Sequence, residues 1–143
     1  MKIFITIFFV LVLVSCKKDE TIPVSDQLKN VWLAKTVKEG STTVFAKGQP
    51  NNSKPGYSQY KLDLTNESTA ILTEFDGRTF SGDYNISSDN KTLTLMNLTP
   101  QPSGTGGTIS YTIRTINETE LTLVATKASL KTGGTINEYS LSL

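Results

Sequence analysis

Apolar and polar residues alternate along most of this chain, in short runs separated by turn residues. Tyr60, Leu62 and Leu64 alternate in one run, and Ile109 and Tyr111 do so in another. A period of two places such side chains on one face of a β-strand. Twenty of the residues from 16 onward are threonine, whose branched Cβ suits a half-exposed strand and disfavours a helix. The alternation therefore predicts an all-β fold with little helix.

Nine runs of this kind follow one another, at residues 31–38, 42–46, 57–65, 69–75, 78–86, 91–98, 108–116, 120–126 and 135–143. Most of the connections are short, which predicts antiparallel neighbours. Asp76-Gly77 predicts a type I′ hairpin turn, with positive φ at both residues. A meander of this size removes its free edges by closing. We therefore predict a single antiparallel up-and-down β-barrel of 8–9 strands, with an open β-sandwich as the alternative.

The first fifteen residues are typical of a signal peptide. Lys2 precedes an apolar run from Ile3 to Val14, and the small residue Ser15 ends the segment. The run has about a dozen residues, whereas a helix needs roughly 20 to cross a bilayer. A cleaved signal peptide at 1–15 is therefore favoured over a permanent transmembrane anchor.

The residues at 13–16, LVSC, resemble the bacterial lipobox, in which the cysteine is acylated and becomes the first residue after cleavage. The resemblance implies fatty acids such as palmitate on Cys16, and several acyl chains together anchor a protein stably. Residues 16–27 would then be a lipidated flexible tether. Its start, KKDE at 17–20, is similar to the signal that sends Bacteroidota lipoproteins to the cell surface; the alternative is a solvated spacer without a targeting role.

Charge and composition exclude several classes of function. The chain has 14 basic and 13 acidic residues, and cleavage after residue 15 removes Lys2, which leaves 13 of each. A neutral domain lacks the basic surface that nucleic acids require. There is no histidine and only one cysteine, which removes His-based catalytic triads, Cys or His zinc sites and an internal disulfide. We expect no cofactor, no metal and no nucleic-acid partner.

Four short motifs resemble the lipocalin-like domains of small Bacteroidota lipoproteins. They lie at 28–32 (LKNVW), 82–86 (GDYNI), 91–95 (KTLTL) and 116–123 (INETELTL). The resemblance implies a lipocalin-like barrel domain over residues 28–143. Lipocalins usually have a glycine two residues before a tryptophan in the first strand. In this chain the tryptophan is Trp32, and Asn30 occupies the position of the glycine.

Six aromatic residues fall on strand faces that also carry aliphatic side chains. They could line a cavity for a small apolar ligand, with the tyrosine hydroxyls as polar contacts. The alternative, which we favour, is that they fill the interior, because a barrel of about eight strands is only just wide enough for either outcome. These candidate ligand-binding residues are Trp32, Tyr60, Phe80, Tyr84, Tyr111 and Tyr139.

Only carboxylates remain as candidates for catalysis. Glu74 with Asp76, and Glu118 with Glu120, are each spaced to share a strand face, and glycoside hydrolysis uses two such groups. Both pairs lie beside predicted turns, where acids are usually solvated, so a glycan hydrolase is the weakest interpretation and we expect no enzyme. The loops at 47–56, 99–107 and 128–134 are longer than hairpins need, and such loops often carry recognition.

The leading hypothesis is thus a non-enzymatic lipoprotein of the cell envelope, anchored on the outer membrane, with exposure at the cell surface implied by the KKDE resemblance. In one version the barrel binds a small apolar ligand or serves as an accessory module. In the other, its loops bind an envelope protein or a glycan while the barrel core is filled.

Overall fold

The structure is a computed structural model that describes residues 22–143. The predicted signal peptide at 1–15 and the predicted lipid site at Cys16 lie outside the described residues. Within 22–143, no helix combines the length and the apolar character that crossing a bilayer requires.

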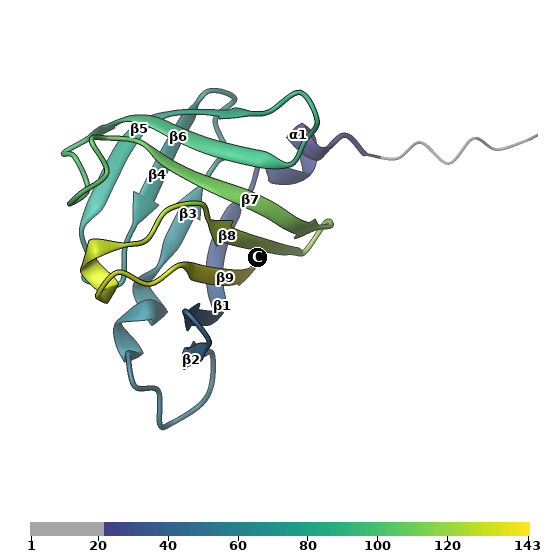
Figure 1. The fold of residues 1–143 in the computed structure, drawn as a ribbon. Helices are drawn as coiled ribbons and strands as arrows, with labels where there is room; N and C mark the ends of the chain where they lie inside the picture. The colour runs from purple at the N-terminus through teal and green to yellow at the C-terminus, as the bar shows by residue number, and fades with distance from the viewer. Residues whose placement is uncertain (1–21) are drawn as a thin grey trace, which may run out of the picture.

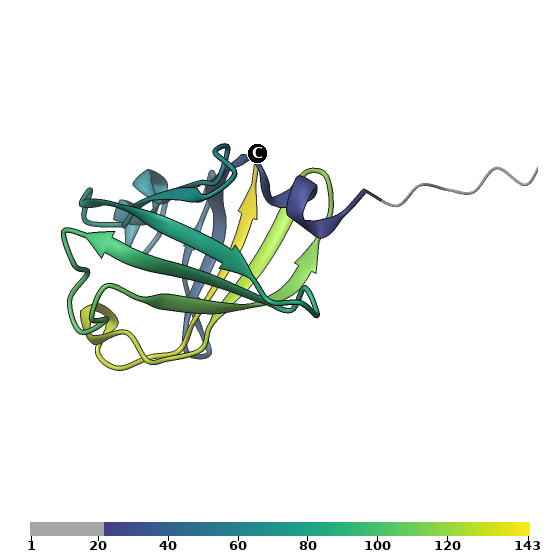
Figure 2. The same cartoon turned by 90° about the horizontal axis from the view of Figure 1, so that it is seen from above.

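Nine antiparallel strands form the framework of the described chain (Figure 1). They are β1 (Val31–Glu39), β2 (Thr42–Ala46), β3 (Lys61–Asp63), β4 (Thr69–Thr73), β5 (Thr79–Ile86), β6 (Thr92–Thr99), β7 (Ile109–Ile116), β8 (Glu120–Ala125) and β9 (Asn137–Ser142). Three short helices accompany them: α1 (Val24–Leu28), η1 (Pro55–Gln59) and η2 (Leu130–Thr132). In Figures 1 and 2, α1 and η2 lie at opposite ends of the sheet.

The sheet closes into a barrel. Each strand from β3 to β9 pairs with the next, and β1 pairs with both β3 and β9. The closing ladder runs from Leu33 opposite Ser142 to Glu39 opposite Asn137. The extra strand, β2, forms a hairpin on the second half of β1. The prediction of an antiparallel barrel is confirmed over the alternative of an open sandwich.

The alternating side chains point into one core. On β1 the buried residues are Trp32, Ala34 and Val37, and on β6 Leu93 and Leu95 are fully buried. Every buried side chain of the core cluster comes from the segment between Leu28 and Leu141, and Val24 of α1 packs against it. The chain from residue 22 therefore contains a complete core and a closed ladder of hydrogen bonds, which is what a domain needs to fold independently.

The strand predicted at 57–65 is much shorter in the structure. Its first part forms η1, which begins at Pro55, and only Lys61–Asp63 pairs as β3. Gly56 lies against the backbone of Phe75, where a Cβ would come 2.4 Å from the carbonyl oxygen. This close approach and the turn that follows bring Tyr57 into the core, where it is fully buried.

The prediction of a type I′ turn at Asp76-Gly77 is wrong. Gly77 has φ +79°, but Asp76 is not among the residues with positive φ. The Gly77 N–H donates to the carbonyl of Glu74 at 2.9 Å, and the Glu74 N–H donates to the carbonyl of Arg78 at 2.9 Å. The connection is therefore one residue longer than a two-residue hairpin, and glycine alone takes the left-handed conformation.

Candidate functional site

Four tyrosines meet inside the end of the barrel that carries η1 and η2. We call Tyr57, Tyr60, Tyr111 and Tyr139 the tyrosine cluster. The rings of Tyr60 and Tyr139 stack with centroids 4.8 Å apart, and Tyr111 meets Tyr139 edge-on at 6.0 Å. Tyr57 also approaches Tyr139 edge-on, at 6.4 Å. Such aromatic pairs are favourable beyond the area they bury, so the cluster packs this end of the barrel firmly.

The other three predicted aromatic residues lie elsewhere in the barrel. Trp32 is at the α1 end, where its Nε1 donates to the carbonyl of Leu28 at 3.0 Å. The hydroxyl of Tyr84 donates to the carbonyl of Leu64 at 3.4 Å. Phe80 lies beneath the ammonium of Lys131, which is 5.3 Å from the ring centre. All six predicted residues are at most 9% exposed, yet they do not form one site.

Burial keeps the phenol groups of the cluster neutral. It is the main cause that raises the pKa of Tyr57, Tyr60 and Tyr111 far above the usual value, and it raises the pKa of Tyr139 to about 12. Two hydroxyls have protein partners: Tyr57 donates to Glu39 at 2.8 Å, and Tyr139 accepts from Asn137 at 3.3 Å. The Tyr60 hydroxyl is buried and has no hydrogen-bond partner among residues 22–143.

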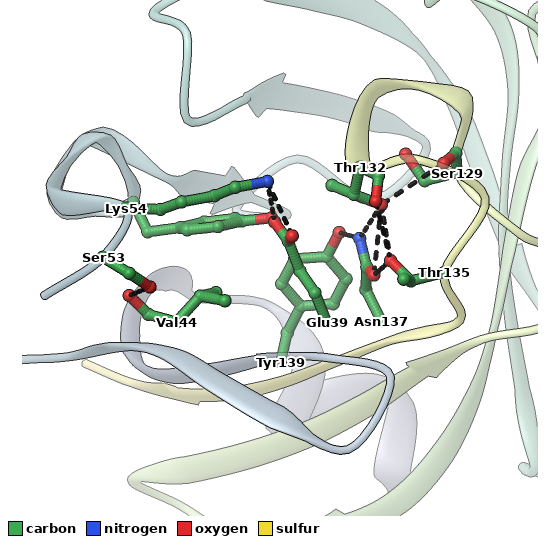
Figure 3. A network of polar contacts seen from close by, with 10 residues as sticks. Glu39, Val44, Ser53, Lys54, Ser129, Thr132, Thr135, Asn137 and Tyr139 are labelled. Carbon is green, nitrogen blue, oxygen red and sulfur yellow. Dashed lines mark hydrogen bonds and ion pairs between the residues drawn. The ribbon is translucent and has the colours of Figure 1, made fainter.

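Two polar networks lie beside Tyr139 (Figure 3). In one, the ammonium of Lys54 binds both carboxylate oxygens of Glu39, at 2.8 and 2.6 Å. In the other, the hydroxyls of Thr132 and Thr135 meet the amide of the fully buried Asn137. Neither network was predicted, because Glu39 and Asn137 have no neighbours in sequence that would mark them as buried polar residues.

A small pocket opens between the loop at 99–107 and the loop that carries η2. Its volume is about 70 Å³, and Tyr111, Tyr139, Glu74, Lys131 and Leu130 are among the residues that line it. Sites for drug-sized ligands usually measure roughly 300–1,000 Å³. The pocket can therefore hold a small chemical group or a few water molecules, but not a large apolar ligand.

Leu130 lies across the mouth of this pocket. Its side chain is 70% exposed, although it contacts the opposite loop. A Cβ added at Gly104, which has φ +75°, would lie 2.5 Å from Cδ1 of Leu130. The absence of a side chain at Gly104 thus lets the two loops meet over the opening.

An ion pair forms one wall of the pocket. The ammonium of Lys131 binds the carboxylate of Glu74 in a very close contact and that of Asp76 at 2.9 Å. Burial by itself would lower the pKa of Lys131, but the hydrogen bonds to the two carboxylates outweigh it and raise the pKa. The Lys131 side chain is only 14% exposed, so this pair is better shielded from solvent than most surface pairs.

The two carboxylate pairs considered for catalysis have different surroundings. Glu74 and Asp76 share one ammonium at the pocket. Glu120 instead pairs with Lys35 at 2.6 Å on the outer wall of the barrel, and Glu118 is exposed at a turn. Glu120 lines a separate hollow of about 220 Å³ on that wall, whereas Glu74 lines the pocket between the loops.

Comparison with solved structures places this barrel among known folds. A lipocalin-like protein from Bacteroides uniformis superimposes with a TM-score of 0.53, at 13% sequence identity, over 81% of this chain and 97% of that chain. The fold is lipocalin-like. An uncharacterized protein from Bacteroides eggerthii matches with a TM-score of 0.49 at 10% identity, over 79% of this chain and 96% of that one. No family model matches the sequence, and no curated protein is similar to it.

The lipocalin-like barrel predicted from the four sequence motifs is thereby confirmed at the level of the fold. At 13% identity, the shared fold does not imply that the two proteins bind the same ligand. Function has to be argued from the pocket of this chain.

Proposed function

We propose that this chain is a non-enzymatic, lipid-anchored binding protein of the cell envelope, which recognises its target at the loop end of its lipocalin-like barrel. In this proposal a small group of the target enters the pocket beside Tyr111 and Tyr139. The target is an envelope protein, a glycan or another molecule that presents such a group. Anchoring through Cys16 on the outer membrane, with exposure at the cell surface, rests on the lipobox-like and KKDE sequences.

The observation that carries this proposal is a filled barrel with a hollow between its long loops, bordered by the buried tyrosines Tyr111 and Tyr139. Trp32, Leu62 and Leu93 are all fully buried in the core. The pocket of about 70 Å³ lies where the long loops meet. A large apolar ligand held inside the barrel is less well supported, because it would have to displace packed side chains.

The position of the described N-terminus agrees with this arrangement. The described chain begins beside α1, and η2 lies at the other end of the barrel (Figures 1 and 2). The pocket is lined by Leu130 and Lys131 of η2. Cys16 is six residues from Ile22, and six residues of extended chain reach at most about 20 Å. A lipid at Cys16 would therefore hold the α1 end towards the membrane and leave the pocket facing away from it.

Blocking the pocket should abolish recognition. We expect ¹⁵N-labelled protein from residue 22 onward, screened by NMR against single monosaccharides, amino acids and small amines, to show shift changes around Tyr111, Tyr139 and Leu130. Ala128→Trp places a large ring at an exposed position that lines the pocket, and it should remove these changes without unfolding the barrel. The matched control, Thr115→Trp, adds the same ring at an exposed position of β7 that does not line the pocket.

The proposal would be contradicted if Ala128→Trp left the shift changes intact. Shift changes at Trp32 and Leu62 with none at the loops would instead favour a ligand inside the barrel.

The anchor is tested separately in cells. Replacing the nucleophilic sulfur in Cys16→Ser should eliminate incorporation of radiolabelled palmitate and move the protein out of the membrane fraction, because no acyl chain can be attached. Thr21→Ala, in the same segment, should change neither result. Retention of Cys16→Ser protein in membranes would show that something other than lipid holds it there.

A further inference from the structure

We infer that the pocket recognises a primary ammonium group of the target, and that Lys131 occupies the place of this group while the target is absent. The inference rests on the proposed function, since it names the chemistry of the group that enters the same pocket. Lysine side chains and amino sugars both present such a group.

Three features around Lys131 form a receptor for an ammonium ion. The carboxylates of Glu74 and Asp76 both accept from it, and the face of Phe80 is 5.3 Å from the nitrogen. Charge-assisted hydrogen bonds and the negative face of an aromatic ring are the contacts by which proteins bind ammonium groups. These contacts show that the site already holds a primary ammonium, supplied by the chain itself.

The receptor and its occupant belong to different parts of the chain. Glu74, Asp76 and Phe80 all lie in the hairpin of β4 and β5, a part of the barrel wall. Lys131 comes from η2, more than fifty residues later in the sequence. The occupant can therefore leave without rearrangement of the groups that bind it.

The segment that carries Lys131 has few other attachments. The N–H of Ser129 donates to the carbonyl of Thr135 at 2.9 Å, and the N–H of Gly134 donates to the carbonyl of Ser129 at 2.9 Å. Among the described hydrogen bonds of residues 128–134, only those of Lys131 reach a residue outside the segment 128–137. Leu130 adds its contact with Gly104 at the pocket mouth. The ion pair is thus one of two polar links that hold this loop against the barrel; the other joins Thr132 to the buried Asn137 of β9.

Departure of Lys131 would leave a site selective for cations. Glu74 and Asp76 would then face the pocket as two carboxylates, with the Glu74 side chain 17% exposed. Lys127 also lines the pocket, but it is exposed and its ammonium forms no ion pair within the described part of the chain. A ligand ammonium restores the lost pairing, whereas a carboxylate would be repelled. The narrow space and the single nitrogen bound there match an ammonium better than a planar guanidinium.

Removing the internal competitor tests this inference. The n-butylammonium ion has the four carbons and the nitrogen of a lysine side chain, and Lys131→Ala leaves room for it. We expect the variant to bind n-butylammonium at least about tenfold more tightly than the wild-type chain, because a tethered group competes at high effective concentration. NMR titration of the chain from residue 22 measures both affinities. Lys47→Ala, which removes an exposed lysine that neither lines the pocket nor belongs to the ion pair, should bind like wild type.

Butyrate and 1-butanol also have four carbons but lack the ammonium group. Titrations with these two probes therefore distinguish recognition of the ammonium from filling of the space that Lys131→Ala leaves. The inference is overturned if Lys131→Ala gains no affinity for n-butylammonium, or if either of the other two probes binds equally well. In that case Ala128→Trp shows whether the proposed function still holds. If Ala128→Trp abolishes target binding, the proposed function is supported although the ammonium inference has failed; if it does not, both are contradicted. If Lys131→Ala does not give the spectrum of a folded protein, Lys131→Met keeps the aliphatic packing, and methylammonium replaces the longer probe with the same expected gain.

Discussion

Tyrosinate absorbance should stay flat through pH 10 and then rise in a single step, together with loss of the β-sheet circular dichroism. All five tyrosines of the chain have a pKa above the usual value, and burial is the main cause at each. Ionisation therefore requires unfolding. In about 8 M urea, where the chain is unfolded, the same groups should titrate near the ordinary tyrosine pKa of about 10.

The sign and size of this effect follow from proton linkage. A group whose pKa is raised by folding contributes stability that is complete below the unfolded pKa and is lost as the pH rises towards the folded pKa. Above pH 10, each such tyrosine lowers the free energy of unfolding by about 1.4 kcal/mol per pH unit. The four tyrosines of the cluster together lower it by about 5 kcal/mol per pH unit. Domains of this size have roughly 5–15 kcal/mol of stability, which places unfolding at about pH 11–13. Gradual ionisation with unchanged circular dichroism would contradict the buried cluster.

Trp32→Ala should lower the free energy of unfolding by about 3–5 kcal/mol, which is typical for truncation of a buried aromatic residue. The Trp32 side chain is fully buried, and its Nε1 bond to Leu28 joins β1 to the end of α1. Urea denaturation followed by circular dichroism measures the loss; fluorescence is unsuitable because this is the chain's single tryptophan.

Trp32→Phe is the matched variant. It keeps a ring in the core, although a smaller one, and should lose less than Trp32→Ala. Part of its loss is the hydrogen bond to Leu28, worth about 1 kcal/mol, with an added penalty for the unpaired carbonyl. Equal losses for the two variants would mean that the hydrogen bond, and not the buried area, dominates at this position.

The strand positions could be predicted because they depend on local pattern. The run at 42–46 coincides with β2, and the run at 78–86 differs from β5 by one residue at its start. The errors occurred where a local rule had a competitor. At Asp76-Gly77, hydrogen bonds between Glu74 and its neighbours in the turn lengthened the connection by one residue. At Tyr57, the turn that begins at Pro55 replaced half of a predicted strand.

The candidate site was predictable only in part. Alternation marked Tyr111 and Tyr139 as inward-facing, and both line the pocket. Alternation also marked Trp32 and Tyr84, which lie away from it, because a period of two specifies a face of the sheet and not a position along the barrel axis. Glu74 and Asp76 attracted attention as a pair of acids, but their shared partner, Lys131, had no distinguishing signal in the sequence.

The sequence by itself determined the class of fold and the inward set of side chains, since both follow from period-two patterning, whereas the pairing of β1 with β9 decided between a barrel and an open sandwich. Only the tertiary structure decided the size of the pocket and the meeting of Lys131 with Glu74 and Asp76, which are 57 and 55 residues away. The physical reason is that packing in a closed barrel depends on register and loop shape summed over every strand. No short stretch of sequence contains that information.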